Sequence, residues 1–214
     1  VNVGLPREVE DPARKGRRVL TGIYKDPVAG PVRVGKLGLA GDGQADLSAH
    51  GGTYKAVYAY SSENVTFWRR ELGRSEFGPG TFGENLTVAD MPDDRVHVGD
   101  VFRVGAARLR VSQPRQPCFK LGLKLGMPDF PKRFLASGRI GFYLEVLAEG
   151  DVAAGDDVRL ESADPAALSI REVTQIMHFA PKDLAGARRA LAVAALSPAW
   201  RAPLEKRLAD AAAR

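Results

Sequence analysis

Short apolar runs separated by glycine and proline turns constrain the fold of this chain more than any other feature of its sequence. Residues 19–24 and 32–37 are two such runs, and the turn signal Gly30-Pro31 lies between them. Residues 95–112 alternate apolar and polar side chains around two glycine turns, residues 55–60 form another short apolar run, and Gly150-Asp151 is a further turn signal. Runs this short, with a period of two, are typical of β-strands. The sequence therefore predicts a mostly β domain of the α+β class.

Helical patterns are shorter within this region and dominate the end of the chain. The predicted helices of the β region cover residues 63–72, 119–126 and 130–135. In the first of them Val65, Trp68 and Leu72 lie on one face, which is the expected core face. Beyond residue 166 the chain is alanine-rich and carries three helix starts, which are the capping box Ser169 to Glu172, the pair Lys182-Asp183, and Ser197-Pro198. We therefore expect a β domain over residues 1–163, and over residues 164–214 a three-helix module too small to bury a core alone.

Composition excludes several classes of protein. One cysteine in 214 residues rules out an internal disulfide and any metal site built from several cysteines. Residues 1–18 are polar, and no run approaches the ~20 apolar residues of a membrane span, so we expect a cytoplasmic protein without a membrane partner. A net charge of +5 indicates an anionic ligand. Because the basic residues are scattered, no specific nucleic-acid partner is expected.

The single cysteine, Cys118, follows a predicted strand and precedes a predicted helix. Pro114 and Pro117 bracket the turn, and Pro117 is expected in the first helical turn, which would place Cys118 near a helix N-terminus. That position, beside Arg115 and Lys120, favours the thiolate, the form that attacks electrophiles and binds metals. Two interpretations stay open here: a reactive or ligating cysteine, or a small buried apolar residue.

A glycine-rich run, GDGQADLSAHGG at residues 41–52, must turn tightly or admit a close neighbour. It lacks the Gly-Lys-Ser/Thr end of a P-loop, but its backbone amides can form an anion nest. His50 lies in this run and Lys55 follows it. A histidine among glycines has little apolar packing, which favours a functional role over a structural one.

Four further polar residues lie at strand ends or in turns. Thr21 and Lys25 belong to the first predicted strand and its exit, where the usual interpretation of a lone lysine is a solvated surface group. Asn85 follows a second glycine-rich loop, and turn chemistry and ligand binding both remain open for it. Arg139 lies in a third glycine turn and can bind an anion through two guanidinium nitrogens.

Four of these segments, in this order, resemble the MOSC family, named for the C-terminal domain of molybdenum cofactor sulfurase, and within it the small bacterial YiiM-like type. They are GDGQADLSAHGG (41–52), KAVYAY (55–60), FGENL (82–86) and QPRQPCFKL (113–121), with Arg139 in SGR (137–139). The end of the chain resembles the three-helix module attached to that type. Phe119 replaces an expected tryptophan, and Thr53-Tyr54 replaces an expected Pro-Asp.

The resemblance implies a β-barrel-like domain that binds a pterin molybdenum cofactor (Mo-molybdopterin), with Cys118 as metal ligand and catalytic residue. Relatives of this type are associated with the reduction of N-hydroxylated compounds, including hydroxylamino base analogues, so the implied protein is a detoxifying oxidoreductase. His50 is implied as a second catalytic residue that delivers a proton. The implied cofactor-binding residues are Thr21, Lys25, His50, Lys55, Asn85, Arg115, Cys118 and Arg139. No flavin or haem motif is present, so the partners would be a small N-hydroxylated substrate and a separate electron-donor protein. An oligomer is compatible with the sequence.

Three other functions remain open on the sequence. The chain can be a carrier of the cofactor, or of sulfur as a persulfide on Cys118 without pyridoxal phosphate. It can bind nucleic acid through its positive charge, with a steep dependence on salt. It can also be a cysteine hydrolase with His50 as base, although nothing near Cys118 suggests an oxyanion hole.

Overall fold

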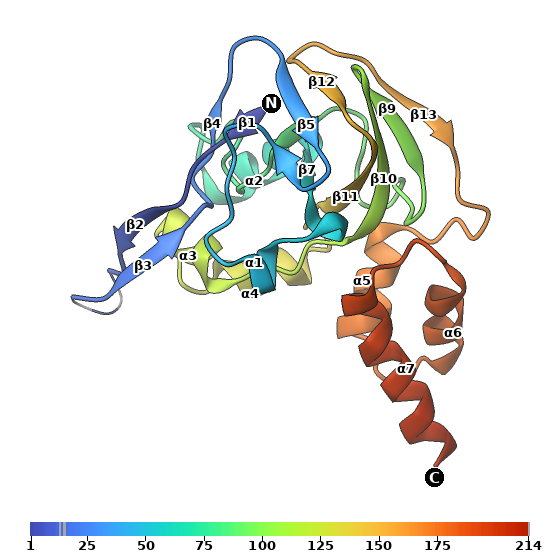
Figure 1. Ribbon diagram of the computed structural model, residues 1–214. Coiled ribbons are helices and arrows are strands. Elements are labelled where there is room, and N and C mark those ends of the chain that lie inside the picture. Colours follow the sequence, from blue (N-terminus) through green and yellow to red (C-terminus); the bar gives the residue numbers. More distant parts are fainter. Residues whose placement is uncertain (13, 15, 214) are drawn as a thin grey trace.

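The computed structural model describes residues 1–12, 14 and 16–213, without the side chain of residue 49 (Figure 1). Its main element is a six-stranded sheet that curls into a half-barrel. The strands are, in spatial order, β13 (Val158–Ser162), β9 (Val101–Val104), β10 (Ala107–Pro114), β11 (Phe142–Ala148), β7 (Val57–Ser61) and β8 (Leu86–Val88). All neighbours are antiparallel except β7 and β8. The predicted α+β class with a barrel-like sheet is confirmed.

Smaller sheets complete the β part. They are β12 (Gly150–Val152) with β5 (Val32–Gly35) and β6 (Gly38–Leu39), β1 (Asn2–Val3) with β4 (Asp26–Pro27), and β2 (Arg7–Glu10) with β3 (Arg18–Thr21). Two local predictions are wrong. Gly150-Asp151, expected in a turn, pairs with β5 because Gly150 lies opposite Val34. Lys55, expected in a strand, ends the 3₁₀ helix Thr53–Lys55, and the strand begins two residues later.

Four helices lie around the half-barrel: α1 (Leu47–His50), α2 (Ser62–Leu72), α3 (Phe119–Leu125) and α4 (Phe130–Ala136). The predicted core face of α2 is confirmed, since Val65 and Trp68 are buried. Trp68 packs on Phe130 and Phe134 with ring centroids 4.8 and 5.9 Å apart. These aromatic rings belong to a hydrophobic cluster that packs α3 and α4 against the outside of the sheet. This packing also positions the segment around Cys118.

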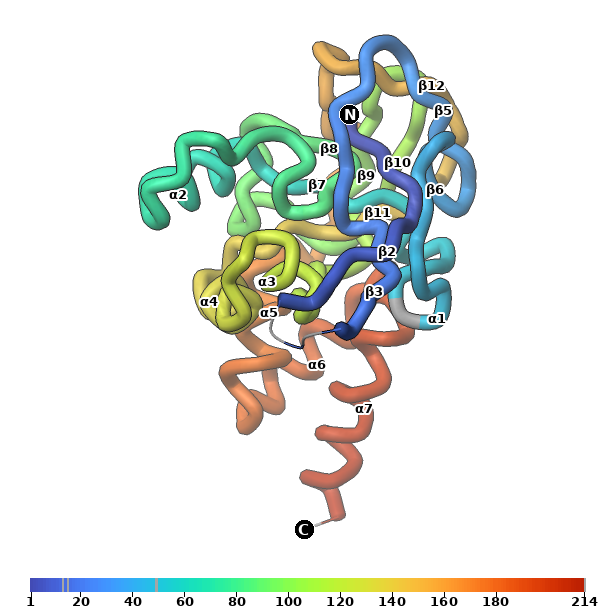
Figure 2. Tube along the Cα trace, turned by 90° about the vertical axis from the view of Figure 1, so that its left-hand side faces the viewer, coloured from blue at the N-terminus to red at the C-terminus, as the bar shows by residue number. Residues whose placement is uncertain are grey.

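The last three helices are α5 (Ile170–His178), α6 (Leu184–Ala192) and α7 (Pro198–Ala212), drawn orange to red in Figure 1 and Figure 2. The predicted capping box opens α5, because Ser169 Oγ accepts from Glu172 N and Ser169 N donates to the Glu172 carboxylate. The buried faces of these helices share one hydrophobic cluster with β10 and β11. In the described part of the chain no helix has the length and apolar content of a membrane span.

Candidate functional site

A pocket lies where the segment around Cys118 faces the glycine-rich loops. It brings together seven residues that the sequence singled out, which are Thr21, Lys25, His50, Lys55, Asn85, Arg115 and Cys118. Three further lining residues, Lys120, Tyr58 and Tyr143, were missed as site residues. Lys120 lies two residues after Cys118, so its position in the sequence could have indicated a site residue. The two tyrosines resemble ordinary aromatic residues of a strand, so nothing in the sequence indicated them. Glycines 22, 43 and 83 also line the pocket, where the loops approach closely.

Cys118 is the N-cap residue of α3, in an extended conformation with φ −124°. It lies four residues beyond the end of β10, and its carbonyl accepts from Leu121 N at 3.0 Å. Pro117 therefore precedes the cap, and the prediction that it lies in the first helical turn is wrong by two positions. The Cys118 side chain lines the pocket and its residue is half-buried. The cysteine is thus reachable and is not part of a dry apolar interior.

Arg115 is the most unusual residue of the pocket wall. It is 5% exposed, and its guanidinium carbon lies 4.9 Å from the centre of the Tyr58 ring and 5.6 Å from that of Phe134. Among the described residues no carboxylate forms an ion pair with it, and its Nη1 atom is buried without a hydrogen-bond partner. Buried donors usually have partners, so this Nη1 atom is available to an acceptor that enters the pocket.

The pocket wall is strongly electropositive. Lys55, Arg115 and Lys120 line it, and none of its lining residues is an aspartate or glutamate. Burial lowers the pKa of His50, and the positive charges of Lys120 and Arg115 lower it further. Burial also lowers the pKa of Lys55. His50 is therefore neutral at pH 7 in the free protein, and an anion placed beside it would raise its pKa again.

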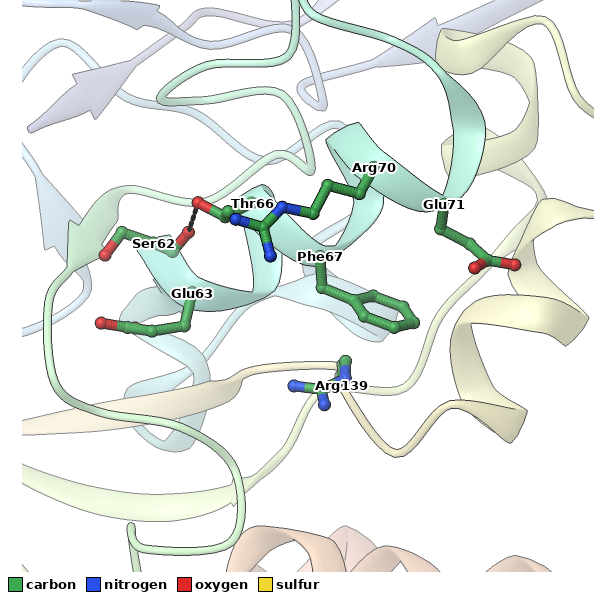
Figure 3. Close-up of a pocket in the computed structure, with 7 residues that line it drawn as sticks. All are labelled: Ser62, Glu63, Thr66, Phe67, Arg70, Glu71 and Arg139. Atoms are coloured by element: carbon green, nitrogen blue, oxygen red, sulfur yellow. Dashed lines mark hydrogen bonds between the residues drawn. The ribbon is translucent and has the colours of Figure 1, made fainter.

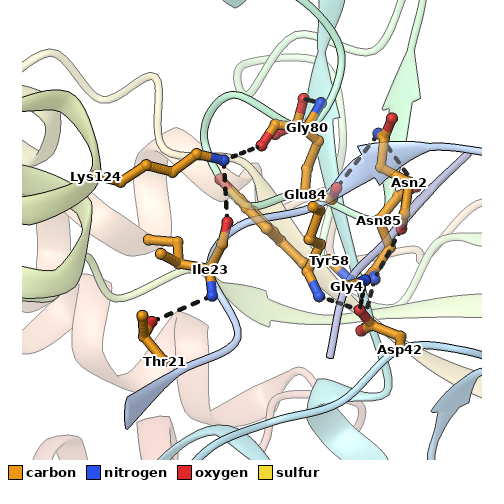
Figure 4. A network of polar contacts seen from close by, with 11 residues as sticks. Asn2, Gly4, Thr21, Ile23, Asp42, Tyr58, Gly80, Glu84, Asn85 and Lys124 are labelled. Carbon is orange, nitrogen blue, oxygen red and sulfur yellow. Dashed lines mark hydrogen bonds and ion pairs between the residues drawn. The ribbon is translucent and has the colours of Figure 1, made fainter. Parts of the chain in front are cut away.

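Lys25 is not the solvated lysine that the sequence predicts. It forms an ion pair with Asp42, and the two side chains are 8% and 2% exposed. Burial lowers the pKa of Lys25, and the Asp42 charge opposes this shift. Asp42 also accepts from Gly4 N at 2.9 Å and from Asn85 Nδ2 at 2.8 Å (Figure 4). Lys25 therefore borders the pocket with its charge balanced inside the protein.

The side chains of Asn85 and Thr21 also form hydrogen bonds within the protein. Asn85 Oδ1 accepts from Tyr58 N at 3.0 Å, which joins its loop to β7. Thr21 Oγ1 accepts from Ile23 N at 3.2 Å and turns the chain after β3. Both residues are buried. In the free protein both residues shape the pocket through these hydrogen bonds, and Asn85 also lines it.

Lys124, in the last turn of α3, holds the opposite wall of the pocket. Its Nζ donates to Ile23 O at 3.0 Å and to Gly80 O at 2.6 Å (Figure 4). Burial lowers its pKa to about 8, although the nearby charge of Glu84 opposes the shift. Glu84 accepts from Gly80 N and Phe82 N, so its carboxylate holds the turn of this loop. Lys124 thus ties the helix that begins at Cys118 to two facing loops.

We expect this lysine to make stability depend on pH in the alkaline range. The ordinary lysine pKa is 10.5, so between pH 8 and 10.5 the unfolded chain binds more protons at Lys124 than the folded chain. Between pH 8 and 10.5 the unfolding free energy of wild type should therefore rise with pH relative to that of Lys124→Met. Urea unfolding of both proteins at several pH values measures the difference. Lys132→Met is the control, because Lys132 is exposed, and its unfolding free energy relative to wild type should not change with pH. If the difference in unfolding free energy between wild type and Lys124→Met did not change with pH either, the role of Lys124 would be contradicted.

Arg139 does not line the pocket of Cys118. It borders a separate open cavity of about 530 Å³ beside α2 (Figure 3). Its Nη1 donates to Asn64 Oδ1 at 3.1 Å, and its guanidinium carbon lies 4.5 Å from the centre of the Phe67 ring. Asn64 in turn bonds the buried carboxylate of Asp93. In the free protein Arg139 therefore supports the loop before β11, and the structure does not bring it together with the other implied cofactor-binding residues.

The described residues hold no cluster of three or more histidines, cysteines, aspartates and glutamates that could bind a metal ion by themselves. Cys118 lies in the pocket wall together with Arg115 and Lys120, and no aspartate or glutamate is among the lining residues. A thiolate is a soft ligand and suits a metal that brings its other ligands with it. The residues present therefore fit an anionic, metal-bearing cofactor better than a bare cation.

Comparison with known proteins identifies the family. Residues 46–159 match the model of the MOSC domain, and residues 168–211 match the model of a YiiM-like, 3-alpha helix domain. The chain belongs to the MOSC family, in its YiiM-like type with the C-terminal helical module.

Individual relatives agree with this assignment. The chain is 40% identical over 207 residues to the uncharacterized protein YflK of Bacillus subtilis, covering 97% of this chain and 92% of that protein. The crystal structure of YiiM from Geobacillus stearothermophilus matches with a TM-score of 0.82 and 38% identity, covering 97% and 96% of the two chains. A protein named reductase from Gibberella moniliformis is 37% identical over 148 residues, which cover 68% of this chain and 26% of that protein.

Proposed function

We propose that this protein is a molybdenum-cofactor-dependent reductase of N-hydroxylated compounds, with Cys118 as the protein ligand to molybdenum. The observation that carries the proposal is the buried Arg115 guanidinium, which has an unpartnered Nη1 and lies in the same pocket as Cys118. Membership of the MOSC family supports it, as does the partial similarity to a protein named reductase. A single reachable thiol beside an unneutralised cation suits a ligand that is both metallic and anionic.

The pocket residues divide into two roles in this proposal. Arg115 and Lys120 bind the anionic part of the cofactor, since both are cationic and line the pocket, and Lys55 lines the same wall. Thr21, Lys25 and Asn85 keep the wall in shape through bonds inside the protein. The backbone of the glycine-rich loops allows the close approach that a pterin and its phosphate require.

The reaction converts a hydroxylamino group to an amine. The N–O bond breaks, two electrons and two protons are taken up, and the oxygen leaves as water. A separate electron-donor protein supplies the electrons, and the bound cofactor supplies two-electron chemistry at the substrate oxygen. His50 delivers one proton to that oxygen, because an anion in the pocket brings its lowered pKa back toward neutrality. The remaining residues orient the substrate.

The test is metal and pterin analysis of protein made in a molybdenum-replete host. Wild type is expected to carry molybdenum and pterin, whereas Cys118→Ala should fold normally and lose the metal, because its only ligating side chain is gone. Thr66→Ala, an exposed site on α2 outside the pocket, serves as control. Equal molybdenum in wild type and Cys118→Ala would refute ligation by this cysteine.

One observation also favours a second candidate, a sulfur or cofactor carrier without catalysis. Cys118 is reachable at the pocket wall, as a persulfide-bearing cysteine must be. A carrier of sulfur would show added sulfur on Cys118 by mass spectrometry and no molybdenum. The same preparations therefore distinguish the reductase from a sulfur carrier, and a carrier of the cofactor would hold molybdenum without reducing N-hydroxylated compounds.

A further inference from the structure

An open groove of about 650 Å³ lies between the hairpin of β2 and β3 and the helix α3 (Figure 2). The turn of the hairpin contributes Arg14 and Arg17 to its wall, and α3 contributes Phe119 and Leu123. Phe119 directly follows Cys118, which lines the pocket. The groove and the pocket therefore adjoin at the start of α3, and the reaction proposed above leaves the groove without a role.

Phe119 is the apolar centre of the groove. It is 53% exposed, whereas Leu121 and Leu125 of the same helix are buried. Pro12 and Pro128 extend the apolar surface on the two sides of the groove. Because these side chains line one continuous groove, they form a patch rather than isolated exposed residues. Apolar patches with polar rims mark the places where other molecules bind.

The charges around this patch are mainly positive. Arg14 and Arg17 are exposed, and Asp11 is the one carboxylate among the lining residues. The adjoining pocket adds Arg115 and Lys120 without an aspartate or glutamate in its lining. The combined surface is therefore complementary to an acidic one. A second copy of this chain would bring the same positive charges to a symmetric contact, so charge opposes self-association here.

The position and composition of the groove suit a protein that delivers electrons. Protein interfaces are enriched in aromatic residues and arginine, which are the residues that line this groove. Complexes that transfer electrons are held by small interfaces, so a single groove of this kind is sufficient. A partner seated on Phe119 is one residue away from Cys118 along the chain. The groove is also concave, which suits a protruding partner side chain better than a flat lipid surface.

We propose that this groove is the docking surface for the electron donor, and that the donor is a protein with an acidic face around its redox group. Phe119 and Leu123 supply the apolar contact, and Arg14 and Arg17 bind carboxylates of the donor. The docked donor gives up the two electrons that cleavage of the N–O bond consumes, its own flavin or iron–sulfur group is oxidised, and two protons from solvent complete the reaction. The inference rests on the proposed function, which requires a donor, and adds where the donor binds.

The test is calorimetric titration of an acidic flavodoxin, an electron carrier with bound FMN, into protein made in a molybdenum-replete host. Wild type is expected to bind flavodoxin at low ionic strength, and added salt should weaken the complex. Phe119→Ala should weaken binding about tenfold through the lost apolar contact. Arg17→Glu should weaken it about tenfold or more, because it places like charges opposite each other. Thermal unfolding checks that each variant is folded.

The helical module supplies matched controls. Phe179→Ala removes a phenylalanine that is 45% exposed, and Arg188→Glu reverses an exposed charge on α6. Both residues lie outside the groove, so each variant should bind flavodoxin within about twofold of wild type. Cytochrome c, a basic electron carrier, should not bind to wild type.

Equal affinity of wild type and Phe119→Ala would overturn the docking surface, and so would the absence of flavodoxin binding to wild type. Equal weakening by Arg17→Glu and Arg188→Glu would show unspecific charge attraction and would overturn it as well. Binding of wild type to vesicles of anionic lipid, or formation of a dimer, that is lost in Phe119→Ala would assign the groove to a membrane or to a second copy instead.

The molybdenum content of the same preparation decides the proposed function separately. Bound molybdenum, with flavodoxin binding that does not depend on Phe119 or Arg17, removes only the docking surface. Flavodoxin binding that depends on both residues, in a protein that never takes up molybdenum, keeps the docking surface for an acidic protein and removes the reductase.

Discussion

Arg115→Met is expected to lose the pterin cofactor and to make the cofactor-free protein more stable. Burying an unpaired ion costs several kcal/mol, whereas a desolvated cation–π contact returns about 2 kcal/mol. Arg115 has two ring contacts and no carboxylate partner among the described residues. We therefore expect unfolding free energy to rise by about 1–3 kcal/mol, while cofactor affinity falls at least roughly tenfold through lost charge-assisted hydrogen bonds.

Urea unfolding of cofactor-free protein and pterin analysis of the loaded protein measure the two effects. Arg108→Met is the matched control, because Arg108 forms a largely exposed ion pair with Glu161 outside the pocket. Its stability should change by less than about 1 kcal/mol and its cofactor content should not change. If Arg115→Met were less stable than wild type and retained the cofactor, the guanidinium would be a structural group.

Asp42→Ala is expected to cause the largest loss of stability, about 3–5 kcal/mol, because it leaves the buried Lys25 ammonium without its partner. It also removes the acceptor of Gly4 N and Asn85 Nδ2, so the wall that faces Cys118 should loosen. Thermal and urea unfolding measure the loss.

Removal of the other partner of this ion pair, Lys25, supplies the control. Lys25→Met leaves Asp42 with two hydrogen-bond donors, so its cost should be smaller, and the double variant should be more stable than Asp42→Ala alone. Glu8→Ala breaks the exposed pair with Arg18 and should cost less than about 1 kcal/mol. A cost below 1 kcal/mol for Asp42→Ala would show that Lys25 reaches solvent when the carboxylate is removed.

Local patterns in the sequence predicted the elements that local interactions determine. The capping box at Ser169 satisfies the first amides of α5 from within four residues, and the apolar spacing of α2 reports its buried face directly. Gly150 failed as a turn because its pairing with β5 joins residues more than a hundred positions apart. A short stretch of sequence does not include both partners of such a contact.

The site residues also divide into those that lie close together in the sequence and those that meet only in the folded protein. Cys118, Arg115 and Lys120 lie within one short segment, and the structure keeps them in one pocket. The ion pair of Lys25 with Asp42 joins two loops, so no local pattern indicates that this lysine is buried. Arg139 follows a glycine turn like the others, yet the turn leads into a different cavity, since its direction depends on the packing of α2.

The hydrophobic cluster that spans the curled sheet and the last three helices has a consequence for how such proteins evolve. Leu109 and Val111 of β10 belong to the same cluster as Ile170, Val173 and Leu204. A recombination event that exchanged the helical tail between relatives would have to match both surfaces at once. The tail and the sheet are therefore expected to be inherited together and to diverge in step.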